Sequence, residues 1–191
     1  LSSDGYALME NVDRSFRLGL ELAAGGRLTR WLRIDGNATL SSNKIIDYRY
    51  TDFDPSGEEL RHITATTDLA YSPSLVAAAI ATAEPVRDLK LQLSGKYVGS
   101  QYMDNTGREC YRQEAYFLLN AKAGYVWRIA QRQYGQPAPE IEVQLTVNNL
   151  LDNHYRIGAW AADDYWDGWH HYAGWYQQPG INVMSRLVVR F

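Results

Sequence analysis

The residues best suited to bind a ligand gather in one stretch of the chain, residues 157–178. This stretch is rich in Trp, Tyr, His and Asp. Rigid amphipathic aromatic side chains can stack on sugars, porphyrins or catecholate rings. The ligand-binding candidates are Trp160, Tyr165, Trp166, Trp169, His170, His171 and Trp175. The competing interpretation is that these side chains pack among themselves and order a long loop at a membrane rim.

The same stretch contains donors that could ligate a metal ion or haem iron. His170 and His171 follow Asp167 closely. Adjacent residues of a strand point in opposite directions, however, so the two imidazoles would not converge on one ion. The sequence therefore favours histidines that merely lie in a loop. It predicts no metal site and no cofactor.

Other kinds of chemistry find little support. The chain has no Gly-rich phosphate loop after a strand, no G-x-S-x-G and no His-Glu-x-x-His helix. Cys110, the single cysteine, has no metal-ligand spacing around it and is interpreted as an inert thiol in a loop. The net charge is −3, and the sequence has no basic cluster that could bind the phosphates of a nucleic acid. We therefore predict neither an enzyme nor a nucleic-acid-binding protein.

The elements that must position these residues are predicted by alternation of apolar and polar side chains. In the last ten residues, Val183, Leu187, Val189 and Phe191 share one face and the arginines share the other. Six further segments alternate in the same way. The seven predicted strands lie near residues 15–22, 31–50, 63–83, 89–97, 117–129, 141–147 and 182–191. The competing prediction is a short helix at 76–81.

Connections between the strands alternate in length. Short turns are predicted at residues 24–27, 83–88 and 131–139. Longer loops are predicted at residues 51–59, around 104–107 and at 157–178. A soluble sandwich would show the same period-two pattern with its apolar face turned inward. Strands of about ten residues, loops that alternate in length and aromatic residues near strand ends favour a membrane β-barrel instead.

Three segments resemble a known family. Residues 96–106 resemble a strand-to-loop segment of TonB-dependent outer-membrane receptors. The sequence of this segment is most similar to that of receptors from Bacteroidetes-type bacteria. Residues 147–155, Val-Asn-Asn-Leu-Leu-Asp-Asn-His-Tyr, resemble the family's near-terminal motif. Residues 178–182, Gln-Pro-Gly-Ile-Asn, followed by a strand ending in Phe191, resemble its closing pattern, with Ile181 where Arg is common.

The resemblance implies an all-β fold in which residues 1–191 form about seven C-terminal strands of a 22-stranded transmembrane barrel. It implies uptake of a scarce solute (a siderophore, haem, cobalamin or a glycan) across the bacterial outer membrane, energised by TonB with ExbB and ExbD. The chain starts at Leu1 without an initiator Met, so we expect a C-terminal fragment that lacks the plug domain. Phe191 would be the signal that the barrel assembly machinery reads.

The face assignments follow from the barrel interpretation. Ile141, Val143, Leu145 and Val147 would face outer-membrane lipid. The charged residues Asp35, Glu140, Glu142, Arg186 and Arg190 would line the wet interior. Two alternatives remain open at this stage: a soluble all-β module with an aromatic carbohydrate-binding loop, and a non-gated porin.

Overall fold

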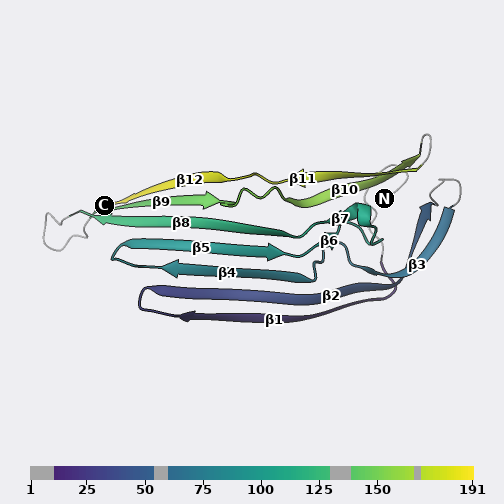
Figure 1. Ribbon diagram of the computed structural model, residues 1–191, viewed down its shortest axis with the longest axis horizontal. Coiled ribbons are helices and arrows are strands. Elements are labelled where there is room, and N and C mark those ends of the chain that lie inside the picture. Colours follow the sequence, from purple (N-terminus) through teal and green to yellow (C-terminus); the bar gives the residue numbers. More distant parts are fainter. Residues whose placement is uncertain (1–10, 54–59, 130–138, 166–168) are drawn as a thin grey trace.

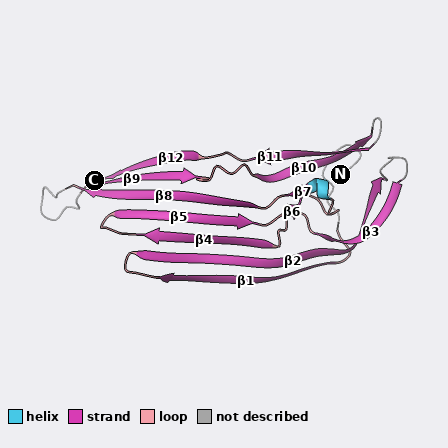
Figure 2. Ribbon diagram, in the orientation of Figure 1, coloured by secondary structure: helices cyan, strands magenta, loops and turns pink. Residues whose placement is uncertain are grey.

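The computed structural model describes residues 11–53, 60–129, 139–165 and 169–191. Strands dominate this part of the chain, which has no α-helix and a single 3₁₀ turn, η1 (Figure 2). The strands are β1 (Ser15–Arg27), β2 (Leu32–Phe53), β3 (Leu60–Asp68), β4 (Leu75–Ala83), β5 (Leu89–Val98), β6 (Gln101–Tyr102), β7 (Arg112–Gln113), β8 (Tyr116–Arg128), β9 (Glu140–Asn148), β10 (Arg156–Tyr165), β11 (Trp169–Gln177) and β12 (Asn182–Arg190). The turn η1 is Glu109–Tyr111.

Eight strands form one antiparallel sheet: seven follow the order β1-β2-β4-β5-β8-β9-β12, and β3 pairs with the far half of β2 (Figure 1). Each strand therefore lies beside the next of the seven along the chain. The sheet is open, with β1 and β12 as its two edges. The predicted all-β antiparallel architecture is confirmed, although the described residues form twelve strands where the sequence predicted seven. No described helix is long and apolar enough to cross a membrane.

The register keeps apolar residues together across the whole sheet. Leu187 lies opposite Val143, and Val143 in turn lies opposite Tyr125. On the other face, Arg190 lies opposite Glu140, and Glu140 lies opposite Arg128. Because a slip of one residue would exchange the two faces, this register preserves one apolar and one polar surface. Within the described residues, no second sheet packs on the apolar face.

The turn predicted at residues 24–27 is wrong, because these residues belong to β1. Gly25 and Gly26 pair with Asp35 and Ile34, and the chain turns later, at residues 28–31. There the Thr29 hydroxyl accepts a hydrogen bond from the Leu32 amide at 3.0 Å. A Cβ at Gly25 would overlap the Asp35 carboxylate. Glycine here marks a close side-chain approach inside a strand rather than a turn.

The strand predicted over residues 63–83 is two strands, β3 and β4, separated at residues 69–74. Both pair with β2, whose 22 residues are long enough to accept two partners end to end. Residues 51–53, predicted as loop, extend β2. Residues 76–81 are strand in β4, so the alternative helix is also wrong. Alanine runs form strands when cross-strand pairing overrides their helix propensity.

The long loop predicted at residues 157–178 is instead a hairpin of β10 and β11, which pair separately from the main sheet. The pairing register of the hairpin shifts between Arg156 and Ala159, which marks a β-bulge at the base of the hairpin, near β9 and β12. The turn predicted at 131–139 and the start of the chain lie almost entirely outside the described residues.

Candidate functional site

Three segments extend beyond the main sheet at the end opposite Phe191: the hairpin of β2 and β3, the segment 99–115 between β5 and β8, and the hairpin of β10 and β11 (Figure 1). The connections at the other end include the short turns after β1 and β4. These two turns agree with the predicted contrast between a short-turn end and a long-loop end, and the third predicted turn, 131–139, lies almost entirely outside the described residues. The aromatic candidates lie at the long-loop end, in the third of these segments.

Segment 99–115 lies between the two hairpins at the long-loop end and contributes the buried side chains Met103, Tyr111 and Gln113. It contains β6, η1 and β7. Met103 and Tyr111 are buried in one cluster with Ala159 of β10, and Ala173 and Trp175 of β11 pack against that cluster. The buried apolar side chains thus fasten the segment to the β10–β11 hairpin.

Arg108 fastens the same segment to the other hairpin. Its guanidinium donates to the Thr51 carbonyl at 3.0 Å and lies 3.1 Å from an Asp52 carboxylate oxygen. The guanidinium carbon also lies 5.7 Å from the ring centre of Tyr50 and 5.9 Å from that of Tyr111, within cation–π range. Only 11% of the Arg108 side chain is exposed. Lysine could not replace Arg108 here, because its ammonium group cannot both stack on the two rings and present a planar set of donors.

Tyr71 links the segment to both neighbours through its backbone and side chain. Its amide donates to the Tyr102 carbonyl at 2.8 Å, and its hydroxyl donates to the Ala159 carbonyl at 2.8 Å. Its φ is 52°, a left-handed conformation that is unfavourable for a bulky residue. The surrounding hydrogen bonds stabilise this conformation. The turn at Tyr71 interrupts the strand between β3 and β4.

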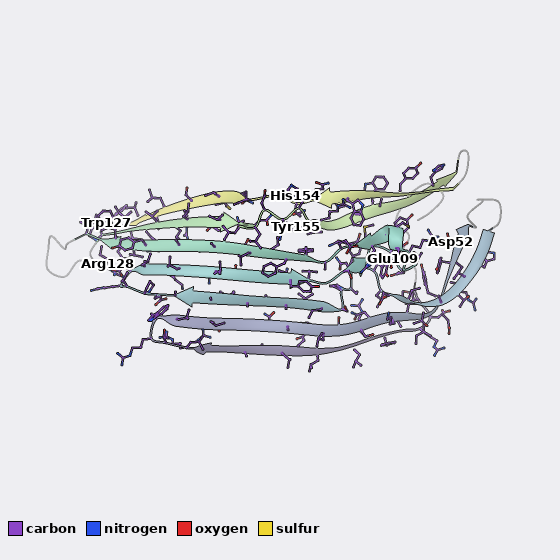
Figure 3. The ribbon with its side chains drawn as sticks, in the orientation of Figure 1. Asp52, Glu109, Trp127, Arg128, His154 and Tyr155 are labelled. Atoms are coloured by element: carbon purple, nitrogen blue, oxygen red, sulfur yellow. The ribbon has the colours of Figure 1, made fainter. Side chains whose placement is uncertain are left out.

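The surface of the segment is polar and paired. Glu109 accepts a hydrogen bond from the Tyr102 hydroxyl at 3.0 Å and forms an ion pair with Arg112 at 3.3 Å (Figure 3 labels Glu109). The hydrogen bond to Glu109 raises the pKa of the Tyr102 phenol, and burial adds to this shift. Cys110 lies exposed in η1, in the loop position expected from the sequence.

The structure separates the ligand-binding candidates rather than gathering all of them. Trp175 packs against the Met103 cluster, with the Arg156 guanidinium 4.7 Å from its ring centre. Trp160 is 54% exposed. The His170 ring stacks on Tyr172 with ring centres 6.2 Å apart.

For Tyr165, Trp169 and His171 the structure gives only the strand pairing: Tyr165 lies opposite Trp169, and His171 lies opposite Asp163. Trp166 and Asp167 lie outside the described residues.

Trp160 and Trp175 belong to opposite faces of the hairpin. Ala159 pairs with Trp175 on the face that packs against segment 99–115, whereas Trp160 pairs with Gly174 one step further on. A Cβ at Gly174 would overlap the Trp160 indole, so this ring lies across the glycine. Neighbouring residues of a strand alternate between faces. The two tryptophans therefore face different surroundings.

The charged residues predicted to line the interior share the polar face. Arg190 lies 2.9 Å from Glu142 and 3.5 Å from Glu140, and Arg128 lies 3.0 Å from Glu140. Arg128 also pairs with Asp88 in the turn after β4 (Figure 3 labels Arg128). These ion pairs join neighbouring strands at the short-turn end. Within the described ranges, no three His, Cys, Asp or Glu side chains are grouped closely enough to hold a metal ion.

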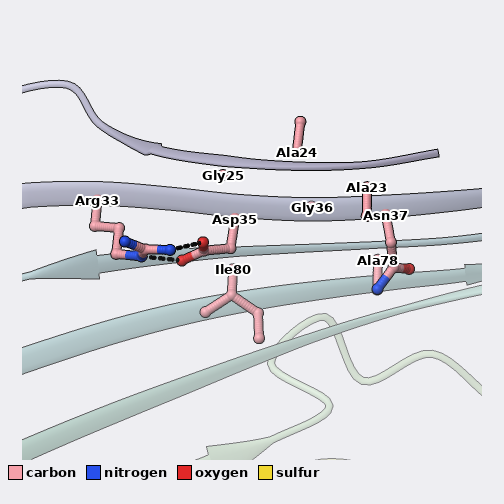
Figure 4. Close-up of a pocket in the computed structure, with 9 residues that line it drawn as sticks. All are labelled: Ala23, Ala24, Gly25, Arg33, Asp35, Gly36, Asn37, Ala78 and Ile80. Atoms are coloured by element: carbon pink, nitrogen blue, oxygen red, sulfur yellow. Dashed lines mark hydrogen bonds and ion pairs between the residues drawn. The ribbon is translucent and has the colours of Figure 1, made fainter.

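A shallow hollow lies on the same polar face, across β1, β2 and β4 (Figure 4). Its floor is made by small residues, including Ala23, Gly25 and Ala78. Arg33 spans its edge and binds the Asp35 carboxylate through two nitrogens, one at 2.7 Å. The charge of Asp35 is thus paired within its own strand. This part of the wall provides a polar surface with no reactive group.

The two C-terminal motifs form one polar corner where β9 ends. Asn149, which is buried, has a φ of 51° and accepts the Asn153 amide at 3.0 Å. Its side-chain nitrogen donates to the carbonyls of Asn153 and Pro179. Asp152 accepts the Ile181 amide at 2.7 Å. The motif residues therefore fix the return of the chain into β12, and their role is structural.

Sequence patterns did not identify Arg108, Tyr71 or the Met103 cluster. The Asn-Thr-Gly at residues 105–107 signals a loop. Nothing local indicates that Arg108 reaches Asp52, 56 positions away along the chain. An arginine directly after the turn residue Gly107 is the single available signal, and it fits a solvated loop equally well.

The geometry defines the class of protein. A wall of long antiparallel strands, apolar on one face and charged on the other, is the wall of a membrane-spanning β-barrel. Residues 2–150 match a family model described as TonB dependent receptor-like, beta-barrel. The chain belongs to this family of receptor barrels. No match was found among curated protein sequences.

Three solved receptors share the fold. The siderophore receptor PiuA from Acinetobacter baumannii has a TM-score of 0.61 at 19% identity, over 92% of this chain and 21% of PiuA. The ferric-catecholate import receptor Fiu from E. coli K12 has a TM-score of 0.53 at 18% identity, over 90% of this chain and 20% of Fiu. The ferric yersiniabactin uptake receptor FyuA from Yersinia pestis has a TM-score of 0.57 at 17% identity, over 93% of this chain and 24% of FyuA. This chain therefore spans less than a quarter of each.

Proposed function

We propose that this chain forms part of the barrel wall of an outer-membrane receptor that imports a small solute with energy delivered through TonB, ExbB and ExbD. The observation that carries the proposal is the family match, combined with a sheet that is apolar on one face throughout. The match covers the strands up to β9, and the structure extends the same alternation through β12.

The orientation follows from the lengths of the connections. In outer-membrane barrels short turns face the periplasm and long loops face outward. We therefore place the end of β12 with Phe191 at the periplasm, and the β2–β3 and β10–β11 hairpins outside the cell. The apolar face, including Val143 and Leu145, then meets lipid, and the face with Glu140 and Arg190 lines the interior.

For the solute, we propose an iron chelate of the siderophore class. The three solved relatives are receptors for siderophores, which supports this class over haem, cobalamin or a glycan. The test is uptake of radioactive iron presented as a ferric catecholate by cells that produce the full-length receptor. Uptake should require both the receptor and TonB. Uptake that persists without TonB would contradict an energised receptor and favour a non-gated porin.

Trp166, Trp169 and Trp175 are proposed to include at least one solute contact. Loss of one stacked aromatic should cost about 1–2 kcal/mol, a roughly five- to thirty-fold drop in affinity. We expect at least one of the three alanine variants to show this drop in ferric catecholate binding to the purified receptor. Trp160→Ala is compared with them, because Trp160 and Trp175 lie on opposite faces and a drop in only one of the two variants would show which face binds the solute. Unchanged affinity in all three variants and in their combination would contradict the proposal.

Phe191 is proposed to be the residue that the barrel assembly machinery reads. It follows β12 directly and is 99% exposed, so it contributes almost no packing within this chain. We expect its deletion to lower the amount of heat-modifiable receptor in the outer membrane. Phe191→Tyr, which keeps a terminal aromatic ring, is the control and should assemble at nearly normal levels. Equal amounts of the wild-type and truncated proteins would contradict a signalling role.

A further inference from the structure

Three lysines on the polar face of β5 and β8 carry charge that the described structure leaves unpaired. Within the described ranges, the ammonium groups of Lys90, Lys96 and Lys122 form neither an ion pair nor a hydrogen bond, whereas Arg128 and Arg190 on the same face both bind carboxylates. β5 and β8 are central strands, flanked by β4 and β9 (Figure 1). Both strands that could supply partners from within the sheet are therefore present, and neither does so.

The three lysines follow one another along the wall. Lys90 lies opposite Gly124, and Lys122 lies opposite Gln92, which is two residues further along β5. Lys96 follows on β5 towards the long-loop end. All three share one face because side chains alternate along a strand. From Lys90 to Lys96 the strand rises about 20 Å, at about 3.3 Å per residue. These residues are called the lysine row below, and the row runs from the long-loop half of the sheet to the short-turn end.

A hollow of about 300 Å³ lies at the short-turn end of the row. Lys90 and Lys122 line it beside Gly124, where the missing side chain leaves space. Two carboxylates, Asp88 and Glu142, also line it, but each forms an ion pair with an arginine.

A further carboxylate lies near the lower end of the row without cancelling its charge. Glu84, in the turn after β4, lines a neighbouring hollow together with Lys90. In the described structure Glu84 forms no ion pair with this lysine. On the other side of β5, Lys96 lies opposite the uncharged Ala78 of β4. Three unpaired cations thus face one unpaired carboxylate, and the charge along the row remains positive.

A row of unpaired ammonium groups attracts anions. A cavity lined by charges of one sign focuses the field and raises the local concentration of ions of opposite sign. Lysine carries a compact charge on a flexible stem, without the rigid fork by which arginine holds an anion in one position. The row is therefore suited to successive, short-lived contacts. A ferric catecholate is an anion, because the charge of its phenolate oxygens exceeds that of the iron.

We infer that the lysine row guides an anionic solute along the β5–β8 sector of the wall, from the long-loop end to the short-turn end. The inference rests on the proposed import function and adds to it the sector of the wall that the solute passes and the charge that the solute carries. The row acts after the solute has left the aromatic residues of the long-loop end. Its lysines therefore affect the rate of import, whereas the first binding step depends on the long loops.

The first test measures import by cells that produce the full-length receptor. Combined Lys90→Gln, Lys96→Gln and Lys122→Gln removes the charge of the row, and arginine at the same three positions keeps it. We expect the maximal rate of ferric catecholate uptake to fall about tenfold in the glutamine variant and to stay near the wild-type rate in the arginine variant. In cells without TonB, the affinity for the ferric catecholate should be the same in all three receptors.

The second test probes the charge of the hollow itself. Gly124→Cys is introduced into the full-length receptor with Cys110→Ser as background and any other cysteine replaced. Outer membranes that contain this receptor are treated with an anionic sulfonatoethyl or a cationic trimethylammonioethyl methanethiosulfonate. The anionic reagent should react faster, and the difference should shrink in the glutamine variant. Heat-modifiability confirms that each variant is folded.

The outcomes separate the row from the import function. Uptake that requires TonB but is equal in the wild-type and glutamine receptors would overturn the inference and leave the import function intact. Equal loss of uptake in the glutamine and arginine variants would also overturn it. So would slow labelling of position 124 by both reagents with less folded receptor in the glutamine variant, because the lysines would then hold an acidic segment of the full-length chain. Absence of TonB-dependent uptake in the wild type would overturn both proposals.

Discussion

Leu145→Arg is expected to lower the free energy of unfolding of the full-length receptor in lipid vesicles by about 2–4 kcal/mol, because it places a charge near the middle of the lipid-facing surface. Leu145 lies in the middle of β9, opposite Ala123 on one side and Ser185 on the other. Both neighbours are small and neutral, so the new guanidinium would have no partner on this face. Urea unfolding at equilibrium, followed by tryptophan fluorescence, measures the difference.

Gln144→Arg is the matched control, one residue away on the polar face. Gln144 lies opposite Gly124, which leaves space for a longer side chain, and beside Glu142, whose carboxylate could pair with the arginine. Arg186 is also opposite, so some repulsion is expected. The cost should nevertheless be much smaller than that of Leu145→Arg. A larger cost for Gln144→Arg, or lipid-phase accessibility at Gln144 exceeding that at Val143, would reverse the assignment of the two faces.

Arg108→Ala should have the largest effect on the long-loop end. It removes a nearly buried guanidinium, and with it the Arg108 contacts to the Asp52 carboxylate and the Thr51 carbonyl. Loss of a charged hydrogen-bond partner in such a place costs about 2–3 kcal/mol. The free energy of local opening of segment 99–115 should fall by this amount, so amide hydrogen exchange there should accelerate about 30- to 150-fold.

The effect should spread to both hairpins but not to the barrel. Exchange in β3 and β10 should rise, since segment 99–115 contacts both sides, whereas β5 and β8 should be unchanged. Arg112→Ala is the control in the same segment, because its ion pair with Glu109 is exposed and should contribute little. A double-mutant cycle with Asp52→Ala isolates the pair. Equal exchange in the Arg108 and Arg112 variants would show that Arg108 does not hold the hairpins.

The motifs that reveal the family have a local explanation that the structure supplies. Asn149, Asp152 and Asn153 form hydrogen bonds across the corner between β9 and β12. Asparagine and aspartate tolerate left-handed conformations and bond to nearby backbone groups, as Asn149 and Asp152 do here. The pattern therefore reports how the last strand is attached. It carries no information about the solute.

The sequence by itself determined the strands of the main sheet and the two faces of that sheet. Both follow from alternation, which is a local property: each strand has its apolar residues at every second position, whatever it pairs with. For this reason the opposite placement of Leu145 and Gln144 could be predicted without coordinates. The same local rule failed where glycine lay inside a strand, at Gly25, because glycine serves both turns and close approaches.

Only the tertiary structure decided how the long-loop end is assembled. Arg108 meets Asp52, and Tyr71 meets Ala159, over separations that no sequence pattern records. The faces of Trp160 and Trp175 depend on the register of the hairpin and on the irregularity between Arg156 and Ala159. A shift of one residue at such a bulge exchanges the two faces for every residue that follows, and only the folded chain shows that the face with Ala159 and Trp175 is the one packed against segment 99–115.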